Sequence, residues 1–89
     1  MDSSSQIVRL TDADNVAVAR KPIPEGTEFH FDGGTLRLPR GVAMGHKFAL
    51  VPIKEGDAIR KYGQVIGFAG RAILPGEHVH VHNLKTKRW

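Results

Sequence analysis

Apolar residues recur along the chain in short runs that alternate with polar residues, the pattern typical of β-strands. No window keeps apolar residues at helical spacing long enough for a stable helix, and a helical turn is allowed at residues 12–15 or 40–46 at most. The pattern predicts an all-β fold of short strands separated by glycine and proline. The strand-like runs cover residues 6–10, 16–20, 47–51 and 64–69.

A β-hairpin is predicted at Asp32-Gly33-Gly34, which separates two alternating segments, residues 27–31 and 35–38. Glycine supplies the positive φ angles that tight hairpin turns need. His30 falls on the polar face of this hairpin, and we expect it at the surface. The predicted buried face carries Phe29, Phe31, Leu36 and Leu38.

The tetrapeptide pattern Ile-x-x-Gly occurs three times and is each time followed, three residues after the glycine, by an apolar residue. It indicates a short strand, a tight turn whose glycine has positive φ, and a return strand. The spacing is too irregular for a solenoid and favours one compact, clip-like or barrel-like sheet. The three copies are Ile23-Pro24-Glu25-Gly26, Ile53-Lys54-Glu55-Gly56 and Ile73-Leu74-Pro75-Gly76.

Composition and charge narrow the class of protein. Eighty-nine residues, 40% of them hydrophobic, make a single globular domain with a thin core. The absence of cysteine excludes disulfides and thiolate metal sites and favours the cytoplasm, and neither a signal peptide nor a membrane span is expected. The net charge is −1 over residues 1–59 and +5 over residues 60–89, which predicts an anionic ligand, an acidic protein surface or nucleic acid near the C-terminal third.

The segment Gly76–Asn83 carries the most informative chemistry, three histidines in strict alternation: His78, His80 and His82. In a continuous strand these side chains project together, while Val79 and Val81 project to the opposite, buried face. Imidazoles at this spacing can bind a metal ion, bind a carboxylate when protonated, or transfer protons near neutral pH. No acidic residue follows to complete a metal triad, so a metal ion would need further ligands from elsewhere. A polar strand face is the structural alternative.

Two further segments are candidates for ligand binding. His46 and Lys47 follow Gly45 at a loop-to-strand junction, a position suited to an anionic ligand, although His46 also fits an ordinary surface residue. Tyr62 and Gln64, next to Lys61, combine a phenol, an amide and a cation around glycines, which a structural turn explains only in part. No phosphate loop, dinucleotide fingerprint, serine nucleophile motif or glycosidase carboxylate pair is present, and the few aromatics argue against nucleic acid.

Four of these segments occur in the same order and at similar spacing in one protein family. They are DNVAVA (residues 14–19), GHK (45–47), KYGQVIG (61–67) and GEHVHVHN (76–83). The sequence resembles the N-terminal SAF domain of altronate and galactarate dehydratases. Its last residues, 83–89, are similar to the stand-alone form of that domain, including the small subunit of sulfolactate sulfo-lyase.

The resemblance implies a β-clip fold at residues 6–84, between a disordered tail at 1–5 and a basic tail at 85–89. It implies a non-autonomous small subunit of a carbon-oxygen lyase that removes water from a sugar acid such as altronate, or sulfite from sulfolactate, together with a large catalytic subunit. Fe²⁺ or Mn²⁺ is the implied cofactor, held here or by the large subunit. His78 and His80 are the expected catalytic residues, His46, Lys47, Tyr62 and Gln64 the substrate-binding residues, and His78, His80 and His82 the metal ligands.

Two other functions remain open at this point. One is a non-catalytic carbohydrate- or ligand-binding module on the same fold, and the other is a basic nucleic-acid-binding domain. A homo-oligomer is compatible with the sequence, and a membrane-bound protein is not expected.

Overall fold

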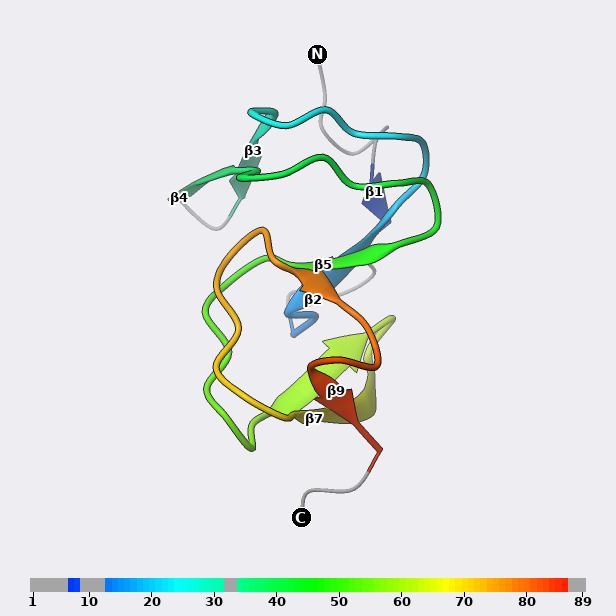
Figure 1. The fold of residues 1–89 in the computed structure, drawn as a ribbon, viewed down its shortest axis with the longest axis vertical. Coiled ribbons are helices and arrows are strands. Elements are labelled where there is room, and N and C mark those ends of the chain that lie inside the picture. Colours follow the sequence, from blue (N-terminus) through cyan, green and yellow to red (C-terminus); the bar gives the residue numbers. More distant parts are fainter. Residues whose placement is uncertain (1–6, 9–12, 32–33, 87–89) are drawn as a thin grey trace.

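The computed structural model describes residues 7–8, 13–31 and 34–86, and this part of the chain is all-β, as predicted (Figure 1). None of the described residues is helical, so the helical turn allowed at residues 40–46 does not form, and no described segment is a candidate membrane-spanning helix. The strands are β1 (Ile7–Val8), β2 (Val16–Ala19), β3 (Glu28–Phe31), β4 (Gly34–Arg37), β5 (Lys47–Ala49), β6 (Ala58–Lys61), β7 (Gln64–Ala69), β8 (His78–Val79) and β9 (Leu84–Lys85).

The strands form three antiparallel sheets along a molecule of 40 × 23 × 21 Å. A central sheet has the order β1-β2-β5-β8, the hairpin β3-β4 lies at one end, and the sheet β6-β7-β9 lies at the other (Figure 1). The register of the β3-β4 hairpin pairs Phe31 with Gly34 and confirms the predicted hairpin, although its two loop residues lie outside the described part of the chain.

The predicted turn occurs four times, once more than the Ile-x-x-Gly pattern shows. We call these turn 1 (Ile23–Gly26), turn 2 (Val42–Gly45), turn 3 (Ile53–Gly56) and turn 4 (Ile73–Gly76). Each glycine has a φ between +83° and +85°, and the next residue donates its backbone N–H to the carbonyl three residues earlier. Turn 2 escaped the sequence pattern because valine, which has the same branched shape, replaces isoleucine at its first position.

The turns associate in two pairs, turn 1 with turn 2 and turn 3 with turn 4. We call this arrangement crosswise pairing, because each turn hydrogen-bonds to the segment that precedes its partner. Ile23 of turn 1 bridges to Val42 of turn 2, and Ile53 of turn 3 bridges to Ile73 of turn 4 (Figure 1). Each turn glycine donates its N–H to a residue that lies four positions before the first residue of the partner turn, over 2.7–2.8 Å. The acceptors for turns 1 to 4 are Leu38, Ala19, Ala69 and Ala49.

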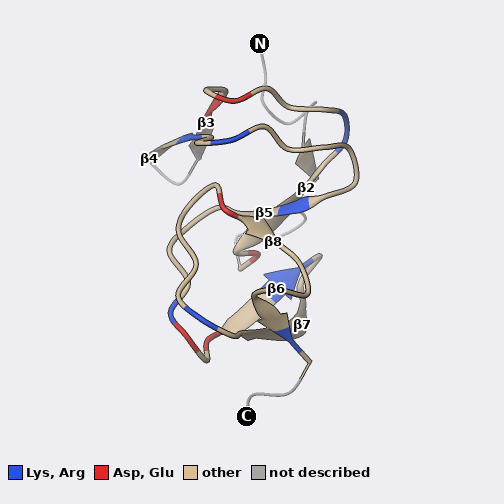
Figure 2. Cartoon of the chain, in the orientation of Figure 1, with Lys and Arg blue, Asp and Glu red and all other residues tan. Residues whose placement is uncertain are grey.

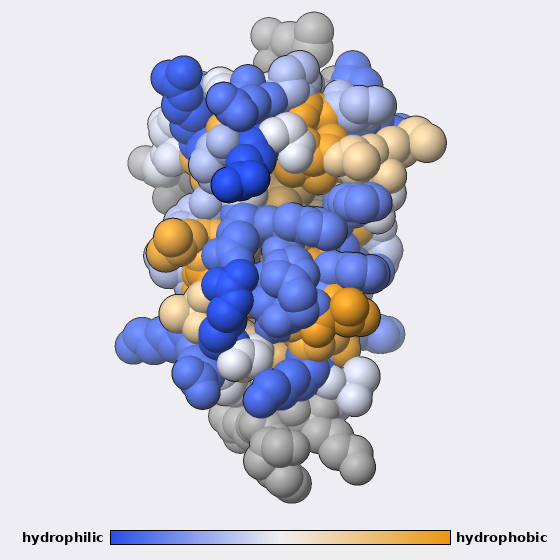
Figure 3. Space-filling model, in the orientation of Figure 1, coloured by the Kyte–Doolittle hydropathy of each residue, from blue (hydrophilic) through white to orange (hydrophobic). Residues whose placement is uncertain are grey.

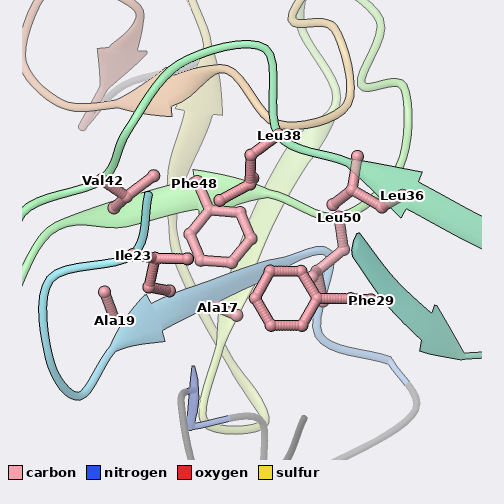
Figure 4. Packing of buried hydrophobic residues seen from close by; sticks show 9 residues of the cluster. All are labelled: Ala17, Ala19, Ile23, Phe29, Leu36, Leu38, Val42, Phe48 and Leu50. Carbon is pink, nitrogen blue, oxygen red and sulfur yellow. The ribbon is translucent and has the colours of Figure 1, made fainter. Parts of the chain in front are cut away.

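Two hydrophobic cores lie on the two sides of the central sheet, and β2 and β5 contribute to both. Phe48 packs into the first core, where its ring stacks on Phe29 with centroids 5.8 Å apart (Figure 4). Its neighbour Ala49 points into the second core, with Ile59 and Val79. Three of the four residues predicted on the buried hairpin face (Phe29, Leu36 and Leu38) are buried, whereas the Phe31 side chain lies outside the described part. His30 is exposed, as predicted.

The described chain continues the sheet into the region expected to be a basic tail. Lys85 belongs to β9 and pairs with Phe68 of β7. Gly67 makes this close approach possible, because a Cβ atom at that position would lie 2.6 Å from the Lys85 carbonyl oxygen. Residues 87–89 and the expected N-terminal tail, 1–5, lie outside the described residues.

Candidate functional site

Strand pairing brings two of the predicted histidines together. His46 follows turn 2 and precedes β5, whereas His78 opens β8 after turn 4 and pairs with Phe48 of β5. Because the ends of turns 2 and 4 meet across this pair of strands, the imidazoles of His46 and His78 stack with centroids 4.8 Å apart and planes 14° apart.

His80 and His82 join this group, but not through the continuous strand that the sequence predicted. β8 ends at Val79, and the chain turns so that the N–H groups of Asn83 and Leu84 both donate to the His80 carbonyl, at 3.0 and 2.9 Å. Val81 is therefore 80% exposed rather than buried, which corrects the prediction. The rings of His80 and His82 each lie 5.7 Å from that of His78. We call His46, His78, His80 and His82 the imidazole cluster.

Asn83 shapes the turn that holds the cluster, a role that sequence reasoning missed. Its side chain is almost fully buried, and its Oδ1 accepts the His80 N–H at 3.0 Å. Its Nδ2 donates to the His78 carbonyl at 2.9 Å and to Glu77 Oε2 at 3.4 Å. The signal was present in the sequence, because asparagine often satisfies backbone groups in tight turns and closes the histidine motif here.

The electrostatic environment favours the neutral form of His78. Burial lowers the pKa of its imidazole below the usual value, and the positive charges of four basic neighbours lower it further. Burial and then the charge of Lys61 likewise lower the pKa of Lys47. Lys47 on β5 and Lys61 on β6 thus bring two positive charges near each other, and both strands carry Lys or Arg in Figure 2. The four neighbours of His78 are His46, His82, His80 and Lys47.

Tyr62 and Gly63 form the two-residue loop of the β6-β7 hairpin, with φ angles of 55° and 77°. The buried carboxylate of Asp14 holds this loop by accepting their N–H groups at 3.0 and 2.7 Å. The Lys61 ammonium lies 5.0 Å from the centre of the Tyr62 ring. Tyr62 and Gln64 are exposed, and their substrate-binding role stays a prediction.

A groove of about 900 Å³ ends at the cluster. Residues 35–37 and 39–43 line one side and residues 74–78 the other, with His46, His78 and His82 among the lining side chains. Glu77, in the second wall, forms an ion pair with Arg71 and accepts the Leu74 N–H at 3.0 Å. Burial alone would raise the pKa of the Glu77 carboxyl, but the Leu74 hydrogen bond and the Arg71 interaction outweigh it and lower the pKa.

The described side chains do not by themselves fit a metal site. No group of three or more histidine, aspartate or glutamate side chains in the described ranges is arranged to hold an ion. The rings of His46, His78 and His80 instead lie nearly parallel, within 14° and 11° across the two stacked pairs. The metal role of His78, His80 and His82 stays a prediction, and an ion would need donors from outside the described residues.

Fold and site together define a small all-β domain in which clip-like turns carry an imidazole cluster at the end of a groove. The chain belongs to the altronate/galactarate dehydratase SAF domain family, whose sequence profile matches residues 5–87. This finding confirms the family expected from the histidine and hairpin motifs, together with the SAF-like fold.

The relatives that the chain matches include enzymes named as a dehydratase and a sulfo-lyase, and the match covers only part of their length. The chain is 47% identical over 81 residues to altronate dehydratase of Escherichia coli (strain K12), a match that spans 91% of this chain and 16% of that enzyme. It is 48% identical over 48 residues to (2R)-sulfolactate sulfo-lyase subunit alpha of Chromohalobacter salexigens, across 54% of this chain and 51% of that subunit. The corresponding subunit of Paracoccus pantotrophus is also 48% identical over 48 residues, which make up 72% of its length.

Proposed function

We propose that this chain supplies an imidazole cluster to a lyase that removes water from a sugar acid, or sulfite from sulfolactate. The observation that carries the proposal is the packing of His46, His80 and His82 around His78 at the end of an open groove. Gathering ionisable rings this closely is unfavourable for a merely structural surface, because any rings that become protonated repel one another. The names of the relatives supply the class of reaction.

The cluster suits the proton transfers of an elimination. Such a reaction removes a proton next to a carboxylate and delivers a proton to the departing hydroxyl group. His78, whose pKa is lowered, is neutral at neutral pH and can accept a proton. His80, stacked beside it, is the second catalytic histidine of the proposal. In its protonated form it donates a proton to the leaving hydroxyl group, which departs as water, and exchange with solvent then removes the proton that His78 gained and restores the one that His80 lost.

The basic groups around the cluster suit the binding of an anionic hydroxy acid. His46 in the cluster and Lys47 beside it provide donors for a carboxylate or sulfonate. Tyr62 and Gln64 are the further substrate-binding residues of the proposal. They lie on the hairpin that also carries Lys61, whose charge acts on Lys47.

The proposal requires a larger partner, as a separate subunit or as the remainder of a longer chain. An open groove on a small domain leaves substrate in contact with water, and the matched segment makes up only 16% of the E. coli altronate dehydratase. Fe²⁺ or Mn²⁺ is the proposed cofactor, with donors from that larger part. The cytoplasm, expected from the cysteine-free sequence, is the proposed location.

The test is an assay of the assembled lyase, with this chain co-produced with its large partner and supplied with altronate, galactarate and sulfolactate. His78→Ala should lower kcat by about two to four orders of magnitude while folding and assembly persist. His30→Ala is the matched control, because His30 is exposed on the β3-β4 hairpin and belongs neither to the imidazole cluster nor to the groove lining. Full activity after joint replacement of His78, His80 and His82 would refute the proposal.

A non-catalytic module that binds hydroxy acids is the second candidate, since the groove and its basic end could hold a ligand without turnover. Calorimetric titration of the isolated chain with the same acids separates the two functions. Tight binding by the isolated chain, combined with an assembled lyase that is indifferent to the histidine changes, would favour the module.

A further inference from the structure

The four turns can be compared with one another, because they share the same backbone conformation and the same buried first position. All four have a buried β-branched residue first and a left-handed glycine last, and the two positions between them point outward. Turns 1 and 3 place at least one charged residue there, in Pro24-Glu25 and Lys54-Glu55. Turns 2 and 4 place Ala43-Met44 and Leu74-Pro75. Since all four turns have the same backbone conformation, the fold does not explain why turns 2 and 4 carry apolar residues at these two positions.

The apolar side chains of turns 2 and 4 are strongly exposed. Leu74 is 67% exposed and Met44 is 65% exposed, although each could be replaced by the lysine or glutamate of the equivalent turn without disturbing the core. Both turns line the groove, through Val42 and Ala43 on one wall and Leu74 and Pro75 on the other. Leu74 lines the groove, and Met44 follows the lining residue Ala43 in the chain. Large exposed apolar residues at and next to a groove indicate a binding surface. Apolar patches also interrupt the hydrophilic surface on the face seen in Figure 3.

The charge and the apolar walls of the groove favour a protein segment over a free hydroxy acid as the bound partner. Arg37 and Arg40 lie among its lining residues, while the acidic residue of the lining, Glu77, is already neutralised by Arg71. The remaining charge of the groove lining, from Arg37 and Arg40, is positive and complements a carboxylate. A free hydroxy acid is a poor match for the apolar walls, because its hydroxyl groups would lose hydrogen bonds to water there.

We propose that turns 2 and 4 form the surface on which the rest of the lyase docks, through a segment with apolar side chains and at least one carboxylate. This inference rests on the proposed function and names its partner surface. The groove runs to His46, His78 and His82, so a segment lying in it covers the imidazole cluster and excludes water from it. The relatives support such a cover, because 84% of the E. coli altronate dehydratase lies outside the matched segment.

The first experiment places a photo-crosslinking amino acid, p-benzoylphenylalanine, at position 74 of the 89-residue chain in its own cells. A matched chain carries it at position 54, the equivalent site in turn 3. We expect position 74 to cross-link to a lyase segment, identified by mass spectrometry as apolar with an acidic residue, and position 54 to give none. Cross-links from position 74 to a second copy of this chain or to nucleic acid, or no cross-link at all, would overturn the proposal.

The second experiment gives turn 4 the sequence of turn 3, with Leu74→Lys and Pro75→Glu. Because turn 3 folds with these residues, the variant should fold, while its affinity for the large lyase part falls at least tenfold in a pull-down titration. The reverse exchange in turn 3, Lys54→Leu and Glu55→Pro, should leave that affinity unchanged. Unaltered assembly of the turn 4 variant would contradict the docking surface.

The two proposals fail separately in these measurements. If docking at turn 4 holds but the histidine variants stay active, the cluster is not the catalytic site. If the histidine variants lose activity but position 74 contacts no lyase segment, the catalytic proposal survives and the docking surface is wrong.

Discussion

His78 connects the proposed chemistry to the stability of the domain, because its folded environment opposes protonation. Burial and the neighbouring positive charges lower the pKa of His78 below its usual 6.5, so the unfolded chain binds a proton where the folded chain does not. Protonation of the unfolded state therefore lowers the free energy of unfolding as the pH falls below about 6.5. Above that pH both states are neutral at this residue, and it adds no pH dependence.

The expected outcome is a urea midpoint that is lower at pH 5.5 than at pH 8, with a smaller difference in His78→Gln. Glutamine keeps a polar side chain of similar reach but does not titrate. His30→Gln, an exposed hairpin substitution, should leave the difference as it is. Identical pH dependence in the native and His78→Gln chains would contradict the proposed environment.

Replacing Asn83 should destabilise the turn that positions the imidazole cluster, because its side chain bonds backbone groups of that turn. Replacement by alanine leaves the His80 N–H and the His78 carbonyl without their side-chain partner in a partly buried turn. The expected cost is about 2–3 kcal/mol of unfolding free energy, measured by chemical denaturation. Gln64→Ala, at an exposed position of β7, should change stability by no more than about 0.5 kcal/mol. A similar cost for both changes would show that the Asn83 contacts contribute little.

At the scale of single elements, the four turns look alike in sequence and differ in their surroundings. Gly45 and Gly76 both have a φ of +83°, but a Cβ atom would meet nothing within 4 Å at Gly45. At Gly76 it would lie 2.5 Å from Pro39 Cδ, where turn 4 packs on the segment before turn 2. Gly45→Ala should therefore cost about 1–2 kcal/mol for the left-handed backbone alone.

Gly76→Ala adds a steric clash to the same backbone cost and should destabilise the domain by about 3 kcal/mol or more. Thermal and urea unfolding of the two variants side by side measure the difference. Equal destabilisation would mean that the two walls of the groove separate easily.

The elements also show what the sequence could and could not predict. Strand alternation and the Asp32-Gly33-Gly34 hairpin were recognisable because each depends on a few adjacent residues. The crosswise pairing of the turns was not, because it depends on backbone contacts between distant segments, such as Gly76 with Ala49. In the histidine segment, the sequence correctly predicted that the rings lie together. It did not predict the turn after Val79 that brings them together, because that turn depends on the buried side chain of Asn83.

At the scale of the whole molecule, the two cores are not independent, because β2 and β5 lie between them. Phe48 and Ala49 are adjacent in the chain yet belong to different cores. Loss of packing on one side should therefore loosen the strand that supports the other side. The domain is expected to unfold in a single cooperative step despite its elongated shape.

Phe48→Ala tests this expectation. It should cost about 3–5 kcal/mol, the usual range for removing a buried phenylalanine. Amide NMR signals from both cores should disappear at the same urea concentration in this variant, as in the unaltered chain. Survival of the second core, around Ile59 and Val79, after the first has melted would show that the two halves fold separately.

The crosswise pairing of the turns also affects how quickly the chain reaches its native state. Gly26 donates to a residue just before turn 2, and Gly45 donates to a residue just before turn 1. Neither turn of a pair can complete its hydrogen bonds until the other segment has arrived, so the entropy of closing the intervening chain is lost before most of the stabilising contacts form. A domain of this size with such mutual dependence belongs among the slow two-state folders, with refolding times of roughly milliseconds to seconds. During synthesis, turn 1 must therefore remain open until the ribosome has delivered the segment that closes it.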